Sequence, residues 1–434
     1  MPLAETIYET AQRALRPALE RMDGPGPKLR RGVESRRHAV EAFEAWSVAH
    51  RDDRRPLLWL HAPSVGETLM AQAILAALVE DLPDAQFAFT YFSPSAERVA
   101  SRVGADVAGT LPWDVTADVR RTLAALRPTA IAFVRTEIWP ILTREARATR
   151  VPLALLNAVL SAHSSRTRLG ARLLLGPAYR RLDAVGAVAR DDALRFRTLG
   201  VPDERLHVTG DARFDQVHAR VQALDRQRPL LRRLADPDAV TVVAGSTWPA
   251  DEERVVPALA LASTGTGTRA RLIIAPHEPD DVHLRALERT LAHQRIGYAR
   301  LARIEESSTP LPDAIIVDRV GVLADLYAVA DLAYVGGGFG RAGLHSVIEP
   351  AALRRPVVFG PHAGNAREAA ELATAGGGFR VRDSDELSAV LSLLVGDADK
   401  RRAAGEAASR FVASKLGGAR RNARLLVELL GVGR

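Results

Sequence analysis

Cysteine is absent from this chain of 434 residues, and lysine is nearly absent, occurring only at Lys28, Lys400 and Lys415. The absence of cysteine excludes disulfides, thiolate nucleophiles and cysteine-ligated zinc sites, and it is compatible with a reducing compartment. The chain has no run of about 20 consecutive apolar residues, and its amino terminus lacks the charged-then-apolar layout of a secretory signal. We therefore expect a cytoplasmic protein that is soluble or peripherally attached to a membrane.

The basic residues are almost all arginine, and they give a net charge of +7 and a sequence pI near 10.1. Such a charge is typical of proteins that bind nucleic acid or an anionic surface. The arginines are spread over the whole length, however, which favours a bias of composition. We expect no nucleic-acid partner.

At 434 residues the chain is too long for one hydrophobic core, so two domains of roughly 200 residues each are expected. Short apolar runs that lead into turns and helical patterns predict parallel strands in an α/β fold. The runs lie at residues 57–61, 87–91, 129–134, 153–156 and 184–187, and again at 240–244, 271–275, 314–317, 332–335 and 357–360. Two open sheets of this kind bind ligands in a crevice at the carboxyl ends of their strands.

A polar, arginine-rich stretch separates the two series of strands. We place a first Rossmann-like domain at residues 56–215, a linker at 216–238 and a second domain at 239–415. Residues 416–434 are expected to form a C-terminal helix that could return to the first domain.

Residues 1–55 form an amphipathic and basic segment that precedes the first strand. Leu3, Ile7, Ala11, Leu15 and Leu19 recur at a spacing of four, which predicts an amphipathic helix, and a run of basic residues follows at 28–37. Such a pair can hold a protein on an anionic membrane leaflet. It is equally typical of a helix packed on its own domain beside a solvated charge run.

Three polar residues follow strands of the first domain. Glu67 lies in the first turn of the helix expected after residues 57–61, where the helix dipole favours an ionised carboxylate. It is either a general base or an ordinary first-turn acid. Glu137 is either a cap or a second carboxylate of the site. Asn157 is likewise either a cap or a site residue.

A glycine-rich stretch marks the second domain. Residues 336–340 read GGGFG at the end of a predicted buried strand, where glycine lets a ligand approach the backbone closely. His345, Glu349 and Asn365 follow and supply hydrogen bonds. The stretch predicts a pocket for a nucleotide or nucleotide sugar.

Other segments could hold the phosphate of such a ligand. Ser246 and Thr247 lie between a strand and a helix start, where they are either a phosphate site or a plain N-cap. Arg213 could neutralise a phosphate. His277 lies just after the end of the next predicted strand, 271–275.

Two further patterns have simpler explanations. Residues 338–343 fit G-x-G-x-x-G, but they lie too far along the chain for a dinucleotide fingerprint. The Asp-x-Asp pairs at Asp236, Asp383 and Asp397 lie in linkers or helix starts, where turn chemistry explains them. No closely spaced pair of histidines indicates a metal, and we expect no metal and no cofactor.

Taken in order, these segments resemble the transferases of 3-deoxy-D-manno-octulosonic acid (Kdo), which move Kdo from CMP-Kdo onto lipid A precursors. The resemblance covers most of the chain, and its specificity lies in an ordered set of eight motifs: HAPSVGE (61–67), SPSAE (93–97), TEIWP (136–140), NAVLS (157–161), TGDARFD (209–215), GSTW (245–248), PHEP (276–279) and the stretch 336–365.

The resemblance implies a fold of the GT-B type, in which two Rossmann-like domains face a central cleft and the second domain holds the nucleotide. It implies an inverting, metal-independent transfer at the cytoplasmic face of the inner membrane, with Glu67 as catalytic base and Glu137 as a second site carboxylate. By the same resemblance the donor is bound by Arg213, Ser246, Thr247, His277, Gly338, His345, Glu349 and Asn365. We expect the acceptor to be bound by Ser64 and Gly66 and by four arginines of the basic run, whose alternative is a solvated charge run: Arg30, Arg31, Arg36 and Arg37.

The chain departs from the family pattern at three positions, because Arg135, Val159 and Ser346 stand where Glu, Arg and Asn are usual. Its amino-terminal segment is also less hydrophobic than the anchor usual in the family. Two alternatives therefore stay open: a related GT-B enzyme that uses a UDP-sugar, such as a lipid A disaccharide synthase or an epimerase, and a non-catalytic descendant that binds nucleotide.

Overall fold

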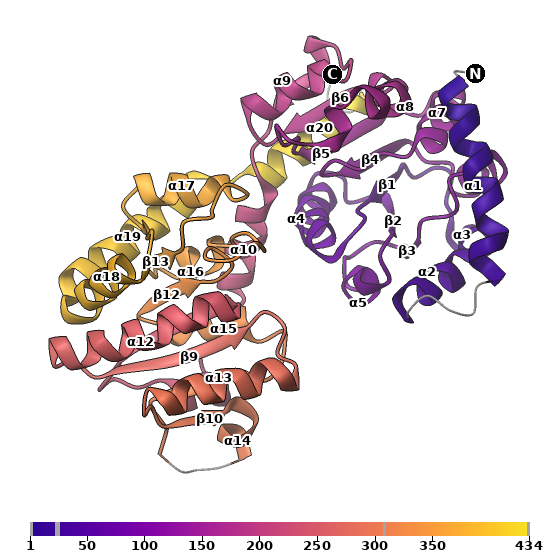
Figure 1. The fold of residues 1–434 in the computed structure, drawn as a ribbon. Helices are drawn as coiled ribbons and strands as arrows, with labels where there is room; N and C mark the ends of the chain where they lie inside the picture. Colours follow the sequence, from indigo (N-terminus) through magenta and orange to yellow (C-terminus); the bar gives the residue numbers. More distant parts are fainter. Residues whose placement is uncertain (1–2, 22–26, 307–309, 432–434) are drawn as a thin grey trace. The chain divides into compact units, whose positions relative to one another are not determined.

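The structure is a computed structural model that describes residues 3–21, 27–306 and 310–431. The chain divides into two compact units, unit 1 (Met1–Gln216 with Leu416–Arg434) and unit 2 (Val217–Lys415). Each unit is an α/β fold built on one parallel sheet, as the sequence predicts, and each sheet has seven strands (Figure 1).

The sheet of unit 1 has the strand order β3-β2-β1-β4-β5-β6-β7, with every pair parallel. Its strands are β1 (Leu57–His61), β2 (Gln86–Tyr91), β3 (Val107–Thr110), β4 (Ala130–Val134), β5 (Leu153–Ala158), β6 (Ala184–Ala187) and β7 (Leu206–Val208). Its helices are α1 (Leu3–Arg21), α2 (Pro27–Arg37), α3 (Ala39–His50), α4 (Val65–Asp81), α5 (Glu97–Ala100), α6 (Thr116–Leu126), α7 (Pro140–Ala148), α8 (Leu169–Arg180), α9 (Arg190–Thr198), α10 (Ala212–Gln222), which crosses into unit 2, and α20 (Gly418–Leu429).

The strands of unit 1 are apolar on both faces because helices cover both. Leu58 and Leu60 of β1 pack in one core with Ile74 of α4, while Leu57 and Trp59 point into a second core on the other face. This alternation follows from the two-residue period of a strand. It explains why β1 reads as a continuous apolar run.

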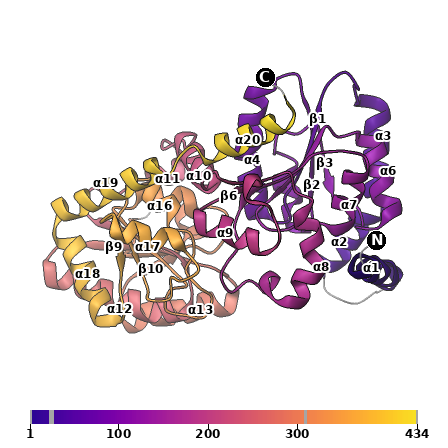
Figure 2. The ribbon, with the colours of Figure 1, turned by 90° about the horizontal axis from the view of Figure 1, so that it is seen from above.

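Unit 2 repeats this plan with the order β10-β11-β9-β8-β12-β13-β14, again all parallel. Its strands are β8 (Val240–Thr247), β9 (Ala270–Pro276), β10 (Tyr298–Arg300), β11 (Ala314–Ile316), β12 (Leu332–Val335), β13 (Val357–Phe359) and β14 (Gly378–Arg380). Its helices are α11 (Pro229–Leu234), α12 (Pro249–Thr266), α13 (Asp281–His293), α14 (Leu301–Glu306), α15 (Leu323–Leu326), α16 (Ile348–Ala352), α17 (Arg367–Thr374), α18 (Ser384–Gly396) and α19 (Ala398–Ser414), with α12 and α18 packed side by side (Figure 2).

The ten apolar runs of the sequence are all strands of the structure. The sequence did not predict β3, β7, β10 and β14, which are the four edge strands of the two sheets. Edge strands are partly exposed and short, so they lack the continuous apolar run by which the inner strands are recognised.

The segment expected to be a linker, 216–238, contains the end of α10 and the short helix α11. Leu231 and Leu234 of α11 are buried in the core of unit 2. Beyond α19 the chain returns to unit 1, where α20 packs against α4, β5 and β6 (Figure 1).

Helix α1 packs on unit 1 through its polar face. Glu5 and Glu9 are buried, whereas Ile7 and Leu15 are 60% and 53% exposed. The expected alternative of a helix packed on its own domain is therefore confirmed, but the apolar stripe faces outward. None of the described helices has both the length and the apolar character needed to cross a membrane.

Candidate functional site

In both units many of the predicted site residues lie near the point where the strand order reverses. In unit 1 the chain moves outward from β1 to β2 on one side and to β4 on the other, so the loops after β1 and β4 lie next to each other. This edge of a doubly wound sheet is where such folds bind ligands. The motifs HAPSVGE and TEIWP occupy these two loops.

Glu67 lies in the first turn of α4, directly after β1, as predicted. It is half-buried, and it accepts a hydrogen bond from the Ser64 hydroxyl at the N-cap of the same helix. Gly66 beside it is exposed, with open space where a side chain would stand. The carboxylate is therefore held in orientation and still reaches solvent.

An aromatic and histidine wall lies beside the two loops. His61 at the end of β1 is fully buried, and its Nε2 accepts a hydrogen bond from Trp139 Nε1 at 3.1 Å while its Nδ1 lies 3.0 Å from Thr90 Oγ1. Burial lowers the pKa of His61 to about 3, so the ring is neutral. Phe92 continues the wall, with its ring 5.3 Å from that of Trp139.

Glu137 lies in the loop after β4, as predicted, and is half-buried. Burial raises the pKa of its carboxyl group, and the nearby carboxylate of Glu67 raises it further, while Arg166 and Arg36 oppose the rise. The structure thus places two carboxylates and two guanidinium groups in one electrostatic neighbourhood of unit 1.

Only one of the four arginines expected to meet the acceptor lies at this site. The Arg36 guanidinium stacks 3.8 Å from the centre of the Phe92 ring and 5.3 Å from that of Trp113, and burial lowers its pKa to about 10. Arg37 bonds the Glu20 carbonyl and pairs with Glu34 instead. The remaining two, Arg30 and Arg31, are exposed on α2.

Asn157 and Arg213 have structural partners in unit 1. The buried Asn157 side chain accepts a hydrogen bond from the Ala212 backbone at 2.8 Å, which ties β5 to the start of α10. Arg213 pairs with Asp211 at 2.7 Å, and although burial opposes ionisation of Asp211, the Arg213 guanidinium lowers the pKa of its carboxyl group. Arg213 is therefore already engaged by a carboxylate.

In unit 2 the equivalent reversal lies between β8 and β12, and the GSTW motif and the glycine-rich stretch 336–340 are found there. Ser246 is half-buried in the left-handed region, at φ +53°. Thr247 is buried, and its hydroxyl donates to the Glu252 carboxylate at 2.8 Å. Thr247 is thus committed to holding the start of α12, and Ser246 is the more accessible of the two hydroxyls.

Asp251 organises the glycine-rich loop. Its carboxylate accepts hydrogen bonds from the Gly337 backbone and the Tyr334 hydroxyl, at 2.8 and 2.7 Å. A side chain at Gly338 would lie 2.7 Å from the Gly360 backbone, so the two loops touch through bare backbone. The loop is therefore packed closely at the site where the sequence predicts a ligand.

Three aromatic side chains meet over this loop. The rings of His277 and His345 stack with their centres 4.3 Å apart, and Trp248 lies 5.1 Å from His277 and donates to His345 at 3.3 Å. Burial lowers the pKa of His345, with a further contribution from His277. The predicted residues His277 and His345 thus lie together, beside Trp248 of the GSTW motif.

The last two predicted donor residues bond within their own segments. Asn365 pairs with both backbone groups of Leu344, at 3.0 and 2.8 Å, and so closes the glycine-rich loop. Glu349 accepts a hydrogen bond from the Ser346 hydroxyl.

The sequence did not single out Arg166 or Asp251 as site residues. Arg166 lies in a short 3₁₀ turn (Ser165–Thr167) far along the chain from Glu137, and no local pattern distinguishes it from other arginines. The sequence indicates that Asp251 is an acidic residue at the start of a helix. Its contacts with residues 334–339 are seen only in the folded structure. Among the described residues, no three His, Asp or Glu side chains converge on a point that could hold a metal ion.

The fold has counterparts among solved structures. The UDP-GlcNAc 2-epimerase of Neisseria meningitidis bound to UDP-GlcNAc superposes with a TM-score of 0.61 at 10% identity, over 86% of this chain and 99% of that one. HepE of Anabaena in complex with UDP gives a TM-score of 0.56 at 16% identity, over 87% and 100%. These likenesses support the expected class, a GT-B fold of two Rossmann-like domains.

Proteins of similar sequence assign this chain to a family. The family described as 3-deoxy-D-manno-octulosonic-acid transferase (kdotransferase) matches residues 36–216. The enzyme of that name from Haemophilus influenzae is 28% identical over 314 residues, 71% of each chain. That from Bordetella pertussis is 32% identical over 405 residues, which cover 86% of this chain and 87% of the relative. This chain belongs to the 3-deoxy-D-manno-octulosonic acid (Kdo) transferase family.

Proposed function

We propose that this protein transfers Kdo from CMP-Kdo to a lipid A precursor in lipopolysaccharide biosynthesis, with inversion at the anomeric carbon and without a metal. The observation that carries the proposal is the geometry around Glu67. This carboxylate is oriented by Ser64, reaches solvent, and lies at the edge of the sheet where ligands bind.

In the proposed reaction the Glu67 carboxylate accepts the proton of the acceptor hydroxyl. The hydroxyl oxygen forms a bond to the anomeric carbon of Kdo, the bond from that carbon to the CMP phosphate oxygen breaks, and CMP leaves with the electron pair. Attack from the face opposite the leaving group inverts the carbon. Such general-base assistance is worth roughly 10²- to 10⁴-fold in rate.

The donor is assigned to the loop edge of unit 2. The proposal places the nucleotide against the close-packed glycines and the side chains of Ser246, His277 and His345. Glu349 and Asn365 would then shape the pocket through the segments they hold. Arg213 pairs with Asp211, so we expect it to contact the phosphate while it keeps this ion pair, and not as an unpaired cation.

The acceptor is assigned to the edge of unit 1. Arg36 and Arg166 carry positive charge beside Glu137, which suits a phosphorylated acceptor, and Trp139 and Phe92 offer an apolar wall. Gly66, with no side chain, leaves room next to Glu67. The exposed Arg30 and Arg31 would add long-range attraction.

We further propose that the protein contacts the cytoplasmic face of the inner membrane through a surface formed by α1 and α8, which pack together. Leu169 and Leu173 of α8 are 73% and 65% exposed, and Ile7 and Leu15 of α1 are 60% and 53% exposed, so both helices present apolar side chains to the outside. Surface arginines accompany these side chains at Arg13, Arg168 and Arg172. Apolar side chains among cations suit an anionic leaflet.

The test is mass spectrometry of a purified reaction containing CMP-Kdo and a tetra-acylated lipid A precursor. Glu67→Gln should lower the rate by roughly 10²- to 10⁴-fold, because it removes the base and keeps the shape. Glu80→Gln is the matched control, since Glu80 lies on the same helix with a 63% exposed side chain. An undiminished rate in the Glu67 variant would refute the role of this residue.

Two further measurements separate the alternatives. CMP, and not UDP, should raise the melting temperature of the wild type and of the Glu67 variant equally. Stabilisation by UDP alone would instead indicate a UDP-sugar enzyme, and CMP binding without any product would indicate a non-catalytic descendant. Product formation should persist in EDTA, and a rate that EDTA abolishes and Mg²⁺ restores would contradict metal independence.

A further inference from the structure

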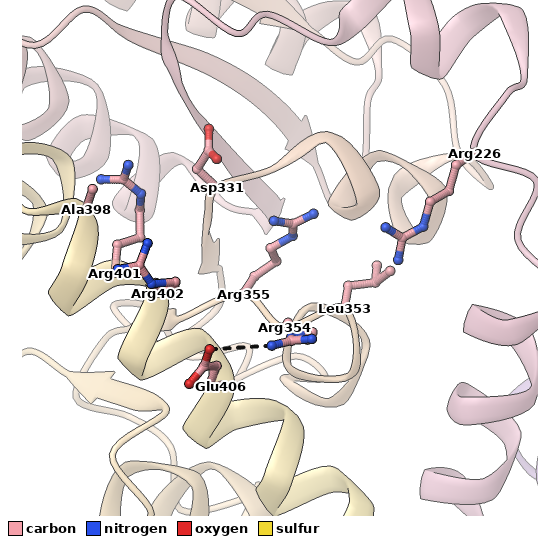
Figure 3. Close-up of a pocket in the computed structure, with 9 residues that line it drawn as sticks. All are labelled: Arg226, Asp331, Leu353, Arg354, Arg355, Ala398, Arg401, Arg402 and Glu406. Carbon is pink, nitrogen blue, oxygen red and sulfur yellow. Dashed lines mark ion pairs between the residues drawn. The ribbon is translucent and has the colours of Figure 1, made fainter.

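A polar cavity lies in unit 2 at the opposite end of the sheet from the glycine-rich loop. It has a volume of about 400 Å³ and is lined by residues next to the amino-terminal ends of β12 and β13 and by the first turns of α19 (Figure 3). The predicted donor residues all lie at or after the carboxyl ends of strands, so this cavity is separate from the predicted donor site.

Positive charge dominates the lining. Five arginines border the cavity, against two carboxylates, at Asp331 and Glu406. The Asp331 carboxylate already accepts a hydrogen bond from the Thr241 backbone at 2.8 Å, and Glu406 pairs with Arg354 at 3.6 Å. With five arginines against two carboxylates the lining keeps a net positive charge, although Arg402 on the rim also pairs with Asp399.

The arginine nearest the protein interior is Arg355. One of its terminal nitrogens donates to the Ala328 carbonyl at 2.8 Å, while its Nε is buried without a hydrogen-bond partner. Burial lowers the pKa of Arg355; the nearby carboxylate of Asp331 opposes this change, and the charges of Arg226 and Arg354 add to it. A buried donor without a partner costs stability, and so does a cluster of like charges.

Two other arginines complete the rim. Arg401 is held by the carbonyls of Leu394 and Val395, at 2.6 and 3.1 Å, which fixes its side chain without neutralising its charge. Arg402 is exposed and contacts Asp399. Neutral carbonyl partners orient a guanidinium group and leave its charge available to an anion.

We propose that this cavity binds an anion with two or more phosphate groups. Guanidinium groups form paired, charge-assisted hydrogen bonds with phosphate oxygens, and several arginines around one space suit more than one phosphate. The volume lies within the range of about 300–1,000 Å³ usual for small-ligand sites. A soluble diphosphate and a phospholipid headgroup share this chemistry. The proposal is independent of the transfer reaction.

The first arm of the test is calorimetric titration of pyrophosphate into the full chain at constant ionic strength. CMP is kept saturating, so that the proposed donor pocket is occupied. The double variant Arg226→Gln/Arg402→Gln removes two exposed arginines of the cavity and should weaken binding at least tenfold. The matched control Arg289→Gln/Arg303→Gln removes two exposed arginines from α13 and α14 of the same unit and should change the affinity for pyrophosphate less than twofold.

The second arm separates the two sources of phosphate by co-sedimentation with vesicles of phosphatidylcholine, with and without cardiolipin, whose headgroup carries two phosphate groups. Capture by cardiolipin that is lost in the cavity variant alone would identify a lipid headgroup. Pyrophosphate binding without such a difference would identify a soluble ligand. Absence of both effects, or equal losses in the cavity and control variants, would overturn the proposal.

Discussion

His61 shows how a single buried residue links the candidate site to stability. It joins the loop after β1 to Trp139 of the loop after β4, and its neutral ring accepts the indole hydrogen bond at 3.1 Å. Protonation would add a charge at a fully buried position and convert this acceptor into a donor. The wall beside Glu67 therefore depends on the neutral form.

This predicts a pH dependence of unfolding. The pKa of His61 is about 3 in the folded protein and near 6.5 when unfolded, so the unfolded state binds the extra proton first and stability falls as pH drops below about 6.5 towards 3. Between pH 6.5 and 5 this amounts to about 2 kcal/mol. His61→Gln should remove that share of the pH dependence.

The measurement is urea unfolding followed by tryptophan fluorescence, which reports mainly on unit 1 because Trp46, Trp59, Trp113 and Trp139 all lie there. His163→Gln is the control, since His163 is exposed. Parallel pH profiles for wild type and the His61 variant would contradict the argument.

Two of the three departures from the family pattern are neighbours. The Val159 backbone donates to the Arg135 carbonyl at 3.3 Å, and Arg135 has a positive φ of +84°. The third, Ser346, bonds Glu349 in unit 2. The paired positions lie at the ends of β4 and β5, near Asp211, whose pKa the charge of Arg135 lowers.

At the scale of elements, α1 is turned with its charged face inward. Glu9 accepts hydrogen bonds from Thr116 and pairs with Arg144 at 3.3 Å, Glu5 pairs with Arg181 at 2.6 Å, and Arg16 reaches Asp118 at 2.8 Å. These partners lie on α6 and α7 and next to α8, so the helix is fastened by ion pairs. Its apolar residues Ile7 and Leu15 stay exposed and are available to contact another surface, such as a membrane.

We expect Ile7→Ser/Leu15→Ser to reduce co-sedimentation with anionic vesicles about tenfold or more, because burying each of these side chains contributes on the order of 1.5–3 kcal/mol. Val282→Ser/Val320→Ser is the matched control, because these valines are 71% and 75% exposed in unit 2. Equal losses in both pairs would rule out α1 as the contact.

For the whole molecule, the return of α20 completes unit 1. The buried Asn422 side chain accepts hydrogen bonds from the Asn157 backbone and the Thr209 hydroxyl, at 2.8 and 3.1 Å. Asp215 in turn accepts from the Gly417 and Ala419 backbones, at 2.7 and 2.9 Å. The last helix of the chain therefore carries part of the core that the first half of the sequence begins.

Asn422→Ala should destabilise unit 1 by about 2–3 kcal/mol and leave unit 2 unchanged, since two buried donors lose their acceptor. Hydrogen exchange resolved by peptide distinguishes the units, and Arg424→Ala, an exposed change on the same helix, is the control. Equal loss of protection in both units would contradict this division of the core.

The sequence by itself determined the ten inner strands, the parallel sheets and the positions of Glu67, Glu137 and the glycine-rich loop, because buried strands and helix starts have local patterns. Only the tertiary structure brought Arg36 and Arg166 to Glu137, and Asp251 to Gly337. It alone also turned the apolar stripe of α1 outward. These results depend on contacts between segments far apart in the chain, and a local pattern carries no information about which distant partner a side chain will meet.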